Sequence, residues 1–451
     1  MKVIKISFKN LEKEVNESRT KILSEVSRYF DLKKQNNQFI PGVTYVQYSG
    51  AVYSDEEARA FIGSFLDGWF GLGPKAEEFE KRLAKTIGTG YGVLTNSGSS
   101  SSLLSVAALS SWKLNEKKLK HDDEVIVAAN SFPTTVNPLL QFGLIPVFLD
   151  PELGTYNVSS NKIKEAITDK TRAVYFAHTL GNPYNMHDLE SICKNNNLFL
   201  IEDNCDALGS KFDGRMTGSF GDLATNSFYP AHHLTCGEGG AILMKSNKLQ
   251  RITKTLRDWG RGCYCSGSDQ KPFGECGNRF EYKLNDIPYD HKYIFDDIGF
   301  NLKPLEFQAA MLLTQLERLP EFTEKRKKNF QMLDNAFKKY EDMFILPKSE
   351  KLADPSWFAY PVTINTDKFT RHEIVTFFEE NKVQTRVQFS GNLTAHPAYK
   401  NVKYKLYGEL NNANKILRDS FFLGVYPGIT DEMMHYITQT LDNYMSHIKN
   451  A

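Results

Sequence analysis

Seven short runs of β-prone residues between residues 90 and 245 constrain the fold of this chain most strongly. They are rich in Val, Ile, Phe and Ala, and helix-like stretches such as 100–112 and 185–197 separate several of them. Continuous apolar strands that alternate with helices are typical of a mostly parallel sheet covered on both faces. The predicted strands are 92–95, 125–129, 146–150, 173–177, 198–203, 224–229 and 241–245.

The rest of the chain indicates the domain organisation. Residues 1–50 show apolar residues at helical spacing and are predicted to form an N-terminal helical arm. Residues 51–325 form the predicted large domain, in which residues 251–297, rich in Gly, Cys, Asp and Tyr, are expected to be a Cys-rich loop excursion. Residues 326–451 hold a strand, a helix and a further strand, which predict a smaller C-terminal α/β domain.

Charge and apolar runs exclude several classes of function. Lys and Arg number 55 and Asp and Glu 54, which argues against nucleic acid or an anionic membrane as the main partner. No apolar run approaches the ~18 residues that span a bilayer, and the first residues lack a signal-peptide pattern, so we expect a cytoplasmic protein with no membrane span. Six Cys without an export signal are core residues, metal ligands or redox groups rather than a disulfide framework.

Two segments that follow predicted strands carry groups suited to a phosphorylated ring cofactor. Residues 96–102 read Asn-Ser-Gly-Ser-Ser-Ser-Ser and open a helix. Free amides and hydroxyls at a helix start suit a phosphate, although Ser-Gly clusters are more often ordinary caps. Asp203 ends the strand 198–203, where an acid can pair with a buried cation such as a protonated ring nitrogen. From spacing alone, a helix cap is the simpler role for Asp203.

Two further segments complete the pattern. Residues 227–240 join two predicted strands and end in Gly-Glu-Gly-Gly, and residues 299–304 read Gly-Phe-Asn-Leu-Lys-Pro before a long helix. Taken in this order, the four segments resemble the DegT/DnrJ/EryC1/StrS sugar aminotransferase family, a branch of the fold-type I pyridoxal-phosphate transferases. The resemblance runs from about residue 45 to the C-terminus. It implies an α/β large domain with a mostly parallel seven-stranded sheet and a smaller C-terminal α/β domain.

The resemblance also assigns cofactor-binding residues. It implies a phosphate loop at Ser97-Gly98-Ser99, a ring stacked on the cofactor's pyridine and an Asp that pairs with the pyridine nitrogen. It further implies an Asn that reaches the phosphate of the neighbouring subunit, and hence a homodimer. The cofactor-binding set expected on this basis is Gly98, Ser99, Ser100, Phe132, Asp203, Asp206, Ser227 and Asn301.

One departure from the family decides the predicted chemistry. Where the family has its cofactor-binding lysine, five residues after Ser227, this chain has His232. Imidazole cannot form the covalent C=N link that holds pyridoxal phosphate, but it can move a proton near neutral pH. We therefore expect His232 to be a catalytic base and the cofactor to be pyridoxamine phosphate. A base at this position also argues against an inactivated relative.

The cysteines extend the resemblance to the 3-dehydratases that act on CDP-4-keto-6-deoxyglucose. Fifty-seven residues separate Cys205 from Cys263, one separates Cys263 from Cys265, and ten separate Cys265 from Cys276. In those enzymes four Cys hold a 2Fe–2S cluster, beside pyridoxamine phosphate and a histidine in place of lysine. The last gap is a few residues longer here, and we expect the extra residues to lengthen a loop without removing Cys276.

These resemblances predict a dehydratase that removes the 3-hydroxyl of a nucleotide-linked 4-keto-6-deoxyhexose, with CDP as the expected nucleotide. The chain shows no G-x-G-x-x-G dinucleotide motif, so the electrons are expected from a separate iron–sulfur flavin reductase that uses NAD(P)H. Three alternatives remain: a cluster-free 3-dehydratase, an aminotransferase that uses His232 in an unusual way, and a non-enzymatic scaffold with a structural zinc. Cys193 and Cys236 are expected to be small core residues.

Overall fold

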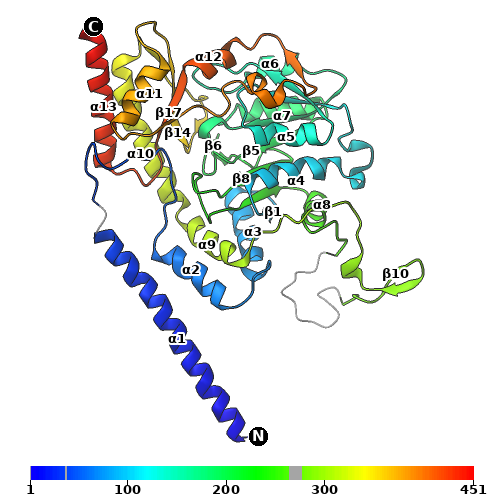
Figure 1. Ribbon diagram of the computed structural model, residues 1–451. Helices are drawn as coiled ribbons and strands as arrows, with labels where there is room; N and C mark the ends of the chain where they lie inside the picture. The colour runs from blue at the N-terminus through cyan, green and yellow to red at the C-terminus, as the bar shows by residue number, and fades with distance from the viewer. Residues whose placement is uncertain (1, 36–37, 264–276, 451) are drawn as a thin grey trace.

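The computed structural model describes residues 2–35, 38–263 and 277–450, with side chains between residues 9 and 449 of these ranges (Figure 1). All seven predicted strands form and lie in one sheet of the order β1-β9-β8-β5-β4-β2-β3-β16. The predicted runs correspond to β1 (Tyr91–Thr95), β2 (Glu124–Ala128), β3 (Ile145–Leu149), β4 (Thr171–Ala177), β5 (Phe199–Asp203), β8 (Leu223–Ser227) and β9 (Gly240–Met244).

The sheet is mostly parallel, as predicted, and differs from the prediction at two places. Strand β9 is antiparallel to both of its neighbours, because only a loop and no crossover helix joins it to β8. An eighth strand, β16 (Lys405–Tyr407), pairs parallel with β3 at the edge of the sheet. The C-terminal quarter of the chain thus extends the sheet. A strand of three residues is too short to be predicted from long apolar runs.

Helices cover both faces of this sheet, which explains why its strands are apolar along their whole length. Along β2, Val125 and Val127 pack in one hydrophobic cluster with helices α4 (Gly98–Ser110), α5 (Pro133–Gln141) and α8 (Asn247–Arg257). Ile126 and Ala128 pack in another cluster with α6 (Ser160–Glu165) and α7 (Met186–Asn195). The period of two along the strand therefore places alternate residues in two separate cores.

Two helices, α2 (Asp55–Leu66) and α3 (Pro74–Ile87), precede the first strand of the sheet. The N-terminal arm is one long helix, α1 (Lys2–Gln35), which lies along α2 and extends away from the body (Figure 1). The long helix predicted after residue 304 is two helices, α9 (Glu306–Glu317) and α10 (Leu319–Phe337). The break lies at Pro320, which has no N–H for the helical hydrogen bond and sits in the first turn of α10.

The C-terminal part has its own sheet and its own hydrophobic cluster. The sheet order is β12 (Phe344–Ile345), β14 (Ala359–Ile364), β17 (Ser420–Gly424) and β15 (Thr385–Arg386). Helices α11 (Arg371–Glu380), α12 (Asn411–Asp419) and α13 (Asp431–Asn450) accompany it. Leu393, Tyr399 and Leu410, however, pack in the core of the large sheet. The domain limits given above stay predictions.

Shorter elements complete the description. Residues 251–257 of the expected excursion belong to α8, and β10 (Tyr282–Leu284) with β11 (Ile287–Tyr289) forms a hairpin that projects from the body (Figure 1). None of the helices in the described part of the chain has both the length and the apolar composition needed to cross a membrane. The remaining elements are β13 (Ala353–Asp354), β6 (Lys211–Phe212) and β7 (Arg215–Met216) in a small sheet, and the 3₁₀ helices Trp112–Lys117, Thr179–Gly181, His291–Tyr293, Lys338–Tyr340, Leu393–Ala395 and Pro397–Tyr399.

Candidate active site

The predicted phosphate loop packs directly against the end of strand β8. A Cβ atom placed on Gly98 would lie 2.5 Å from the Cβ of Ser227, so only glycine permits this approach. Ser97 caps helix α4, and its Oγ accepts a hydrogen bond of 3.0 Å from the backbone N–H of Ser100. Ser99 is exposed at the same helix start. A free helix N-terminus with hydroxyl groups therefore lies beside Ser227, as a phosphate site requires.

The Gly-Glu-Gly-Gly turn supports this loop from the other side. A Cβ atom on Gly240 would lie 2.4 Å from the backbone oxygen of Ser97. The main chain at the start of β9 therefore passes directly against the main chain that opens α4. A side chain at Gly98 or at Gly240 would block this approach. Gly98 and Ser227, expected from the sequence to share a site, are brought together in the structure.

Asp203 lies buried at the end of β5, held by three donors. Its Oδ2 accepts a hydrogen bond of 2.7 Å from the Thr135 hydroxyl, and its Oδ1 accepts one of 3.3 Å from the Thr225 hydroxyl and one of 3.2 Å from the backbone N–H of Cys205. These contacts fix the carboxylate in one orientation. They leave it suited to pair with a protonated ring nitrogen at the carboxyl ends of the strands.

Phe132 stands at the start of α5, in the same segment as Thr135. Its ring is 48% exposed, and its centroid lies 6.2 Å from that of Phe389, edge to face. A large aromatic side chain left this exposed beside a buried carboxylate is available to stack on a planar ligand. The residues present therefore suit a phosphorylated pyridine: a helix start for the phosphate, Asp203 for the ring nitrogen and Phe132 for the ring face.

His232 and Asp206 form a close pair next to this pocket. The Nδ1 atom of His232 lies 3.1 Å from Oδ1 of Asp206, and both side chains are largely buried. Burial raises the pKa of the Asp206 carboxyl, and the neighbouring His232 opposes that rise. The contact directs Nδ1 toward the carboxylate, which leaves Nε2 as the ring nitrogen able to exchange a proton elsewhere.

A buried arginine supports the segment that carries His232. Arg326 of α10 donates from Nη2 to the backbone oxygen of His232 at 3.4 Å, and from Nη1 to the oxygens of Trp357 and Phe358 at 3.2 Å. Burial lowers its pKa to about 9, while the charge of Asp206 acts in the opposite direction. The sequence offers no motif that marks Arg326, since it stands as one basic residue among several in a helix.

The neighbouring His233 has a different environment. It is buried, and its Nε2 lies 2.7 Å from the backbone oxygen of Ser356. Burial and the nearby Arg326 charge hold the pKa of His233 well below its ordinary value. His233 is therefore held within the core, whereas His232 is the histidine that contacts Asp206.

The two described cysteines of the predicted cluster contact different groups. The Sγ atom of Cys205 lies 4.0 Å from the Thr225 hydroxyl, and burial together with Asp203 raises its pKa well above the ordinary value. The Sγ atom of Cys263 lies 3.1 Å from Nε2 of His291. Within residues 2–35, 38–263 and 277–450, no three His, Cys, Asp or Glu side chains gather as a metal site would require. The predicted ligands Cys265 and Cys276 lie outside the described residues.

The lone cysteines behave as expected. Cys193 is buried in the cluster with α7, and Cys236 is buried beneath the Gly-Glu-Gly-Gly turn. Burial raises the pKa of Cys193 to about 12, because the thiolate would lose its hydration. Their prediction as core residues is confirmed.

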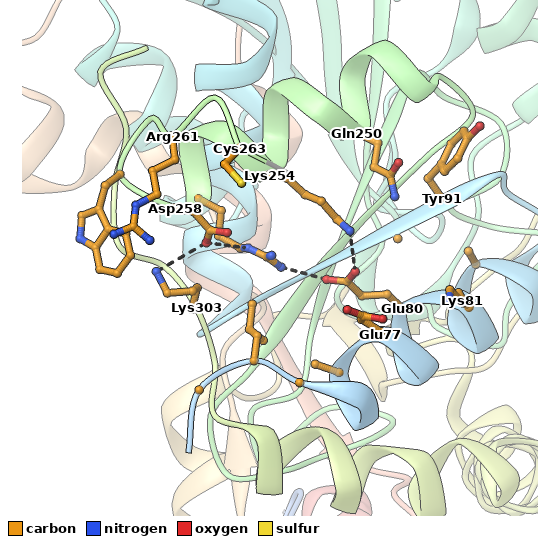
Figure 2. A pocket seen from close by; sticks show the side chains of 18 of the residues that line it. Glu77, Glu80, Lys81, Tyr91, Gln250, Lys254, Asp258, Arg261, Cys263 and Lys303 are labelled. Carbon is orange, nitrogen blue, oxygen red and sulfur yellow. Dashed lines mark hydrogen bonds and ion pairs between the residues drawn. The ribbon is translucent and has the colours of Figure 1, made fainter. Parts of the chain in front are cut away.

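A separate cavity of about 790 Å³ lies between α3, β1, α8 and the segment after α8 (Figure 2). Neither His232 nor Asp203 lines it, and no motif in the sequence predicts it. Cys263 lies on its wall beside a chain of ion pairs. The pairs are Lys254–Glu80 at 3.4 Å, Arg257–Glu80 at 2.9 Å, Arg257–Asp258 at 3.2 Å and Lys303–Asp258 at 3.5 Å.

Asn301 lies between this cavity and the phosphate loop. It is exposed and forms an isolated antiparallel bridge with Asp258, and the next residue, Leu302, accepts a hydrogen bond of 2.8 Å from the backbone N–H of Asn96. The segment 299–304 is therefore tied to the base of the phosphate loop. Whether Asn301 serves a neighbouring subunit stays a prediction.

The sheet order, the Ser-Gly loop and the strand-end Asp together define an enzyme of the fold-type I pyridoxal-phosphate class. The chain belongs to the DegT/DnrJ/EryC1/StrS aminotransferase family, whose model matches residues 53–442. The family and the fold class expected from the sequence are therefore confirmed.

Individual relatives refine this similarity. The chain is 44% identical to the lipopolysaccharide biosynthesis protein RfbH of Salmonella typhimurium, over 95% of this chain and 98% of that protein. It is 43% identical to the dTDP-4-dehydro-2,6-dideoxy-D-glucose 3-dehydratase of Saccharopolyspora spinosa, over 96% and 93%. Among solved structures, E. coli GDP-4-keto-6-deoxy-D-mannose-3-dehydratase with bound hydrated PLP is similar with a TM-score of 0.79 and 28% identity, over 88% of this chain and all of that one.

Proposed function

We propose that this chain removes the 3-hydroxyl of a nucleotide-linked 4-keto-6-deoxyhexose with pyridoxamine phosphate as cofactor. The observation that carries the proposal is His232, which occupies the family's lysine position and lies 3.1 Å from Asp206 beside the cofactor pocket. A histidine there cannot anchor pyridoxal phosphate covalently, as aminotransferases of this class require. Two of the relatives, from S. spinosa and E. coli, are named as 3-dehydratases of such sugars.

The residues around the pocket divide the work of holding the cofactor. The start of α4 at Gly98, Ser99 and Ser100 would bind the phosphate, because a helix N-terminus is positively polarised and hydroxyl groups stand beside it. Asp203 would keep the ring nitrogen protonated, and Phe132 would cover the ring face. When bound, pyridoxamine phosphate supplies an amine that condenses with the C4 ketone and a ring that accepts electrons.

His232 and its supports provide the proton chemistry. Because Asp206 lies against Nδ1, the imidazole is oriented and Nε2 is the atom that takes a proton at the reacting centre. Arg326 holds the backbone of His232 and adds a positive charge beneath Asp206. Together these residues place one base, in one orientation, beside the buried cofactor site.

The finer assignments rest on the cysteine spacing and on the relatives. We propose CDP as the nucleotide, a homodimer completed through Asn301, and cytoplasmic synthesis of a 3,6-dideoxyhexose. We also propose a 2Fe–2S cluster on Cys205, Cys263, Cys265 and Cys276, which would receive electrons from an NAD(P)H-dependent iron–sulfur flavin reductase. The 44% identical Salmonella protein is named for lipopolysaccharide biosynthesis, which supports the sugar pathway but names neither nucleotide nor cluster.

The cluster-free 3-dehydratase is the second candidate, because removal of the 3-hydroxyl itself requires only the cofactor and a base. Iron and sulfide content of anaerobically purified protein separates the two. We expect two irons per chain that disappear in Cys205→Ser and Cys263→Ser but remain in the matched controls Cys193→Ser and Cys236→Ser. Iron-free wild-type protein that still forms the 3-deoxy sugar at full rate would establish the cluster-free 3-dehydratase.

Substrate and reaction are tested together. Protein with pyridoxamine phosphate is offered CDP-, dTDP- and GDP-linked 4-keto-6-deoxyhexoses, with and without glutamate, and the products are weighed by mass spectrometry. When a reductase of the proposed kind and NADH are also present, replacement of the 3-hydroxyl of the CDP sugar by hydrogen is the expected result. Formation of a 4-amino sugar that depends on glutamate would instead identify an aminotransferase. Consumption of the dTDP or GDP sugar alone would keep the dehydratase and replace the nucleotide.

A further inference from the structure

Helix α1 leaves an apolar stripe uncovered. Five large apolar side chains along it are each between 43% and 59% exposed, and all residues from 9 to 18 are exposed. The stripe repeats at intervals of three and four residues when Ser18 and Glu25 are included, which is the spacing of a coiled-coil seam. Its apolar members are Leu11, Val15, Ile22, Tyr29 and Leu32.

The stripe is not the face that binds the body of the molecule. Arg19 forms an ion pair of 2.7 Å with Asp67 at the end of α2, and Ser27 donates a hydrogen bond of 2.7 Å to Asp55 at its start. At about 100° per residue, Arg19 and Ser27 point roughly a quarter turn or more away from the stripe. The helix therefore presents one face to α2 and a second, apolar face to nothing within the described chain.

The first half of α1 also extends beyond the body without support (Figure 1). Most helical stability in proteins comes from packing an apolar face, which the projecting half of α1 does not do within the described chain. An extended helix with a continuous apolar stripe is thus expected to be covered in the native assembly.

The order of residues along the stripe identifies what covers it. Read from either end, the pattern is nearly the same about Ile22. In an antiparallel pair centred there, Ile22 meets Ile22 of a second copy and Val15 meets Tyr29, while Leu11 and Leu32 come within one residue of the same level. Ser18 and Glu25 likewise come within one residue of the same level, where the Ser18 hydroxyl can donate to that carboxylate.

The flanking charges favour the same arrangement. The antiparallel pair brings Glu14 near Arg28 and Glu12 near Lys33 of the second copy, and the two-fold axis repeats each of these attractive pairs, whereas the one like-charge pair on the same flank, Lys21 with Lys21, occurs once. A parallel pair would place Glu25 against Glu25 within the seam, which is repulsive. We propose that α1 pairs antiparallel with α1 of a second copy of this chain, about a two-fold axis at Ile22.

The test uses paired cysteine substitutions in the full chain. Val15→Cys/Tyr29→Cys in one chain should give a covalent dimer on mild oxidation, whereas each single variant should not. The two positions lie about 21 Å apart along one helix, so they cannot form a disulfide within one chain. Thr20→Cys, exposed on the opposite side of α1, is the matched control, and the unmodified chain gives the background from native cysteines.

A second substitution tests the centre of the seam. Ile22→Glu in the double-cysteine chain should lower the covalent-dimer yield about tenfold, because two carboxylates would meet without partners. Thr20→Glu should leave the yield unchanged. Cross-linking of Val15→Cys alone would show a parallel pair, and equal yields at residues 15, 29 and 20 would show random collision. Either result, or no cross-link in the double variant, overturns the proposal.

Discussion

The cofactor pocket and the cavity of Figure 2 are built in opposite ways. The pocket around Asp203 and Ser227 is made of backbone amides and hydroxyl groups at strand ends, where glycines let main chains touch. The cavity is walled by a chain of charged side chains, Glu80, Arg257 and Lys303 among them, which come from three distant parts of the sequence. Main-chain geometry leaves motifs in a sequence, whereas a side-chain network assembled from distant segments does not.

The largest expected effect concerns the pocket and His232. His232→Asn should lower the rate of dehydration by about 10²- to 10⁴-fold, because a positioned base contributes that much to proton transfer. Steady-state kinetics with the sugar nucleotide and added pyridoxamine phosphate measures the loss. His232→Lys should also lose dehydration but retain pyridoxal phosphate covalently, seen as a mass increase after borohydride reduction. The control is His187→Asn, which alters an exposed His–Asp pair.

Breaking an ion pair in the wall of the cavity should lower the free energy of unfolding and leave the rate of dehydration unchanged. Glu80→Gln removes one acidic partner of Arg257, which is buried and also donates to the backbone oxygen of Leu94. Arg257 keeps its second acidic partner, Asp258, so the loss of the Glu80 charge should lower the free energy of unfolding by about 1.5–3 kcal/mol, measured by urea denaturation. Glu77→Gln on the same helix and cavity wall should change it by less than about 0.5 kcal/mol. Equal losses for both variants would contradict the proposed importance of the ion pair.

A smaller effect tests the close approach in the pocket. Gly98→Ala places a methyl group 2.5 Å from the Cβ of Ser227. The overpacking should lower the free energy of unfolding by about 1–3 kcal/mol and weaken binding of pyridoxamine phosphate, followed by its fluorescence. Gly71→Ala, where a Cβ meets nothing within 4 Å, is the control. If both variants bind the cofactor as the wild type does, Gly98 is not the cradle that we describe.

The smallest effect is a pH dependence at Asp206. Burial raises its pKa in the folded state above the value of about 3.9 in the unfolded chain. The folded protein therefore holds this proton more tightly, and the contribution of Asp206 to stability is present below pH ~4 and lost as the pH rises through the raised pKa. Compared with Asp206→Asn, the wild type should lose free energy of unfolding as the pH rises above ~4. An unchanged difference over that pH range would mean that the pKa is not raised.

Most of the fold could be predicted from the sequence, because each apolar strand and each helix has a pattern within its own few residues. It missed β16, whose three residues are too short to show a pattern, and it merged α9 with α10 across Pro320. In the site, Asp203, Ser227 and His232 were visible as motifs. Thr135 and Thr225, which hold Asp203, were missed, although Thr225 lies two residues before Ser227 and hence on the same face of β8.

The remaining omissions have a common physical cause. Arg326 lies 94 residues from His232 and carries no local signature, since its role depends on the tertiary packing of α10 under the loop after β8. The ion pairs of the cavity likewise join α3 to α8 across 177 residues. Contacts of this kind depend on the tertiary fold, and the local sequence around each residue does not predict them.

The central claim is that the His232 pocket removes the hydroxyl at carbon 3, and isotope exchange tests it most directly. The chain is incubated with pyridoxamine phosphate and CDP-4-keto-6-deoxyglucose in H₂¹⁸O without a reductase, and the recovered sugar nucleotide is examined by mass spectrometry. Reversible loss of water should introduce ¹⁸O at carbon 3 with the wild type and not with His232→Asn. Recovered sugar without ¹⁸O at carbon 3, after exchange at the carbon 4 ketone has been subtracted, would contradict the account.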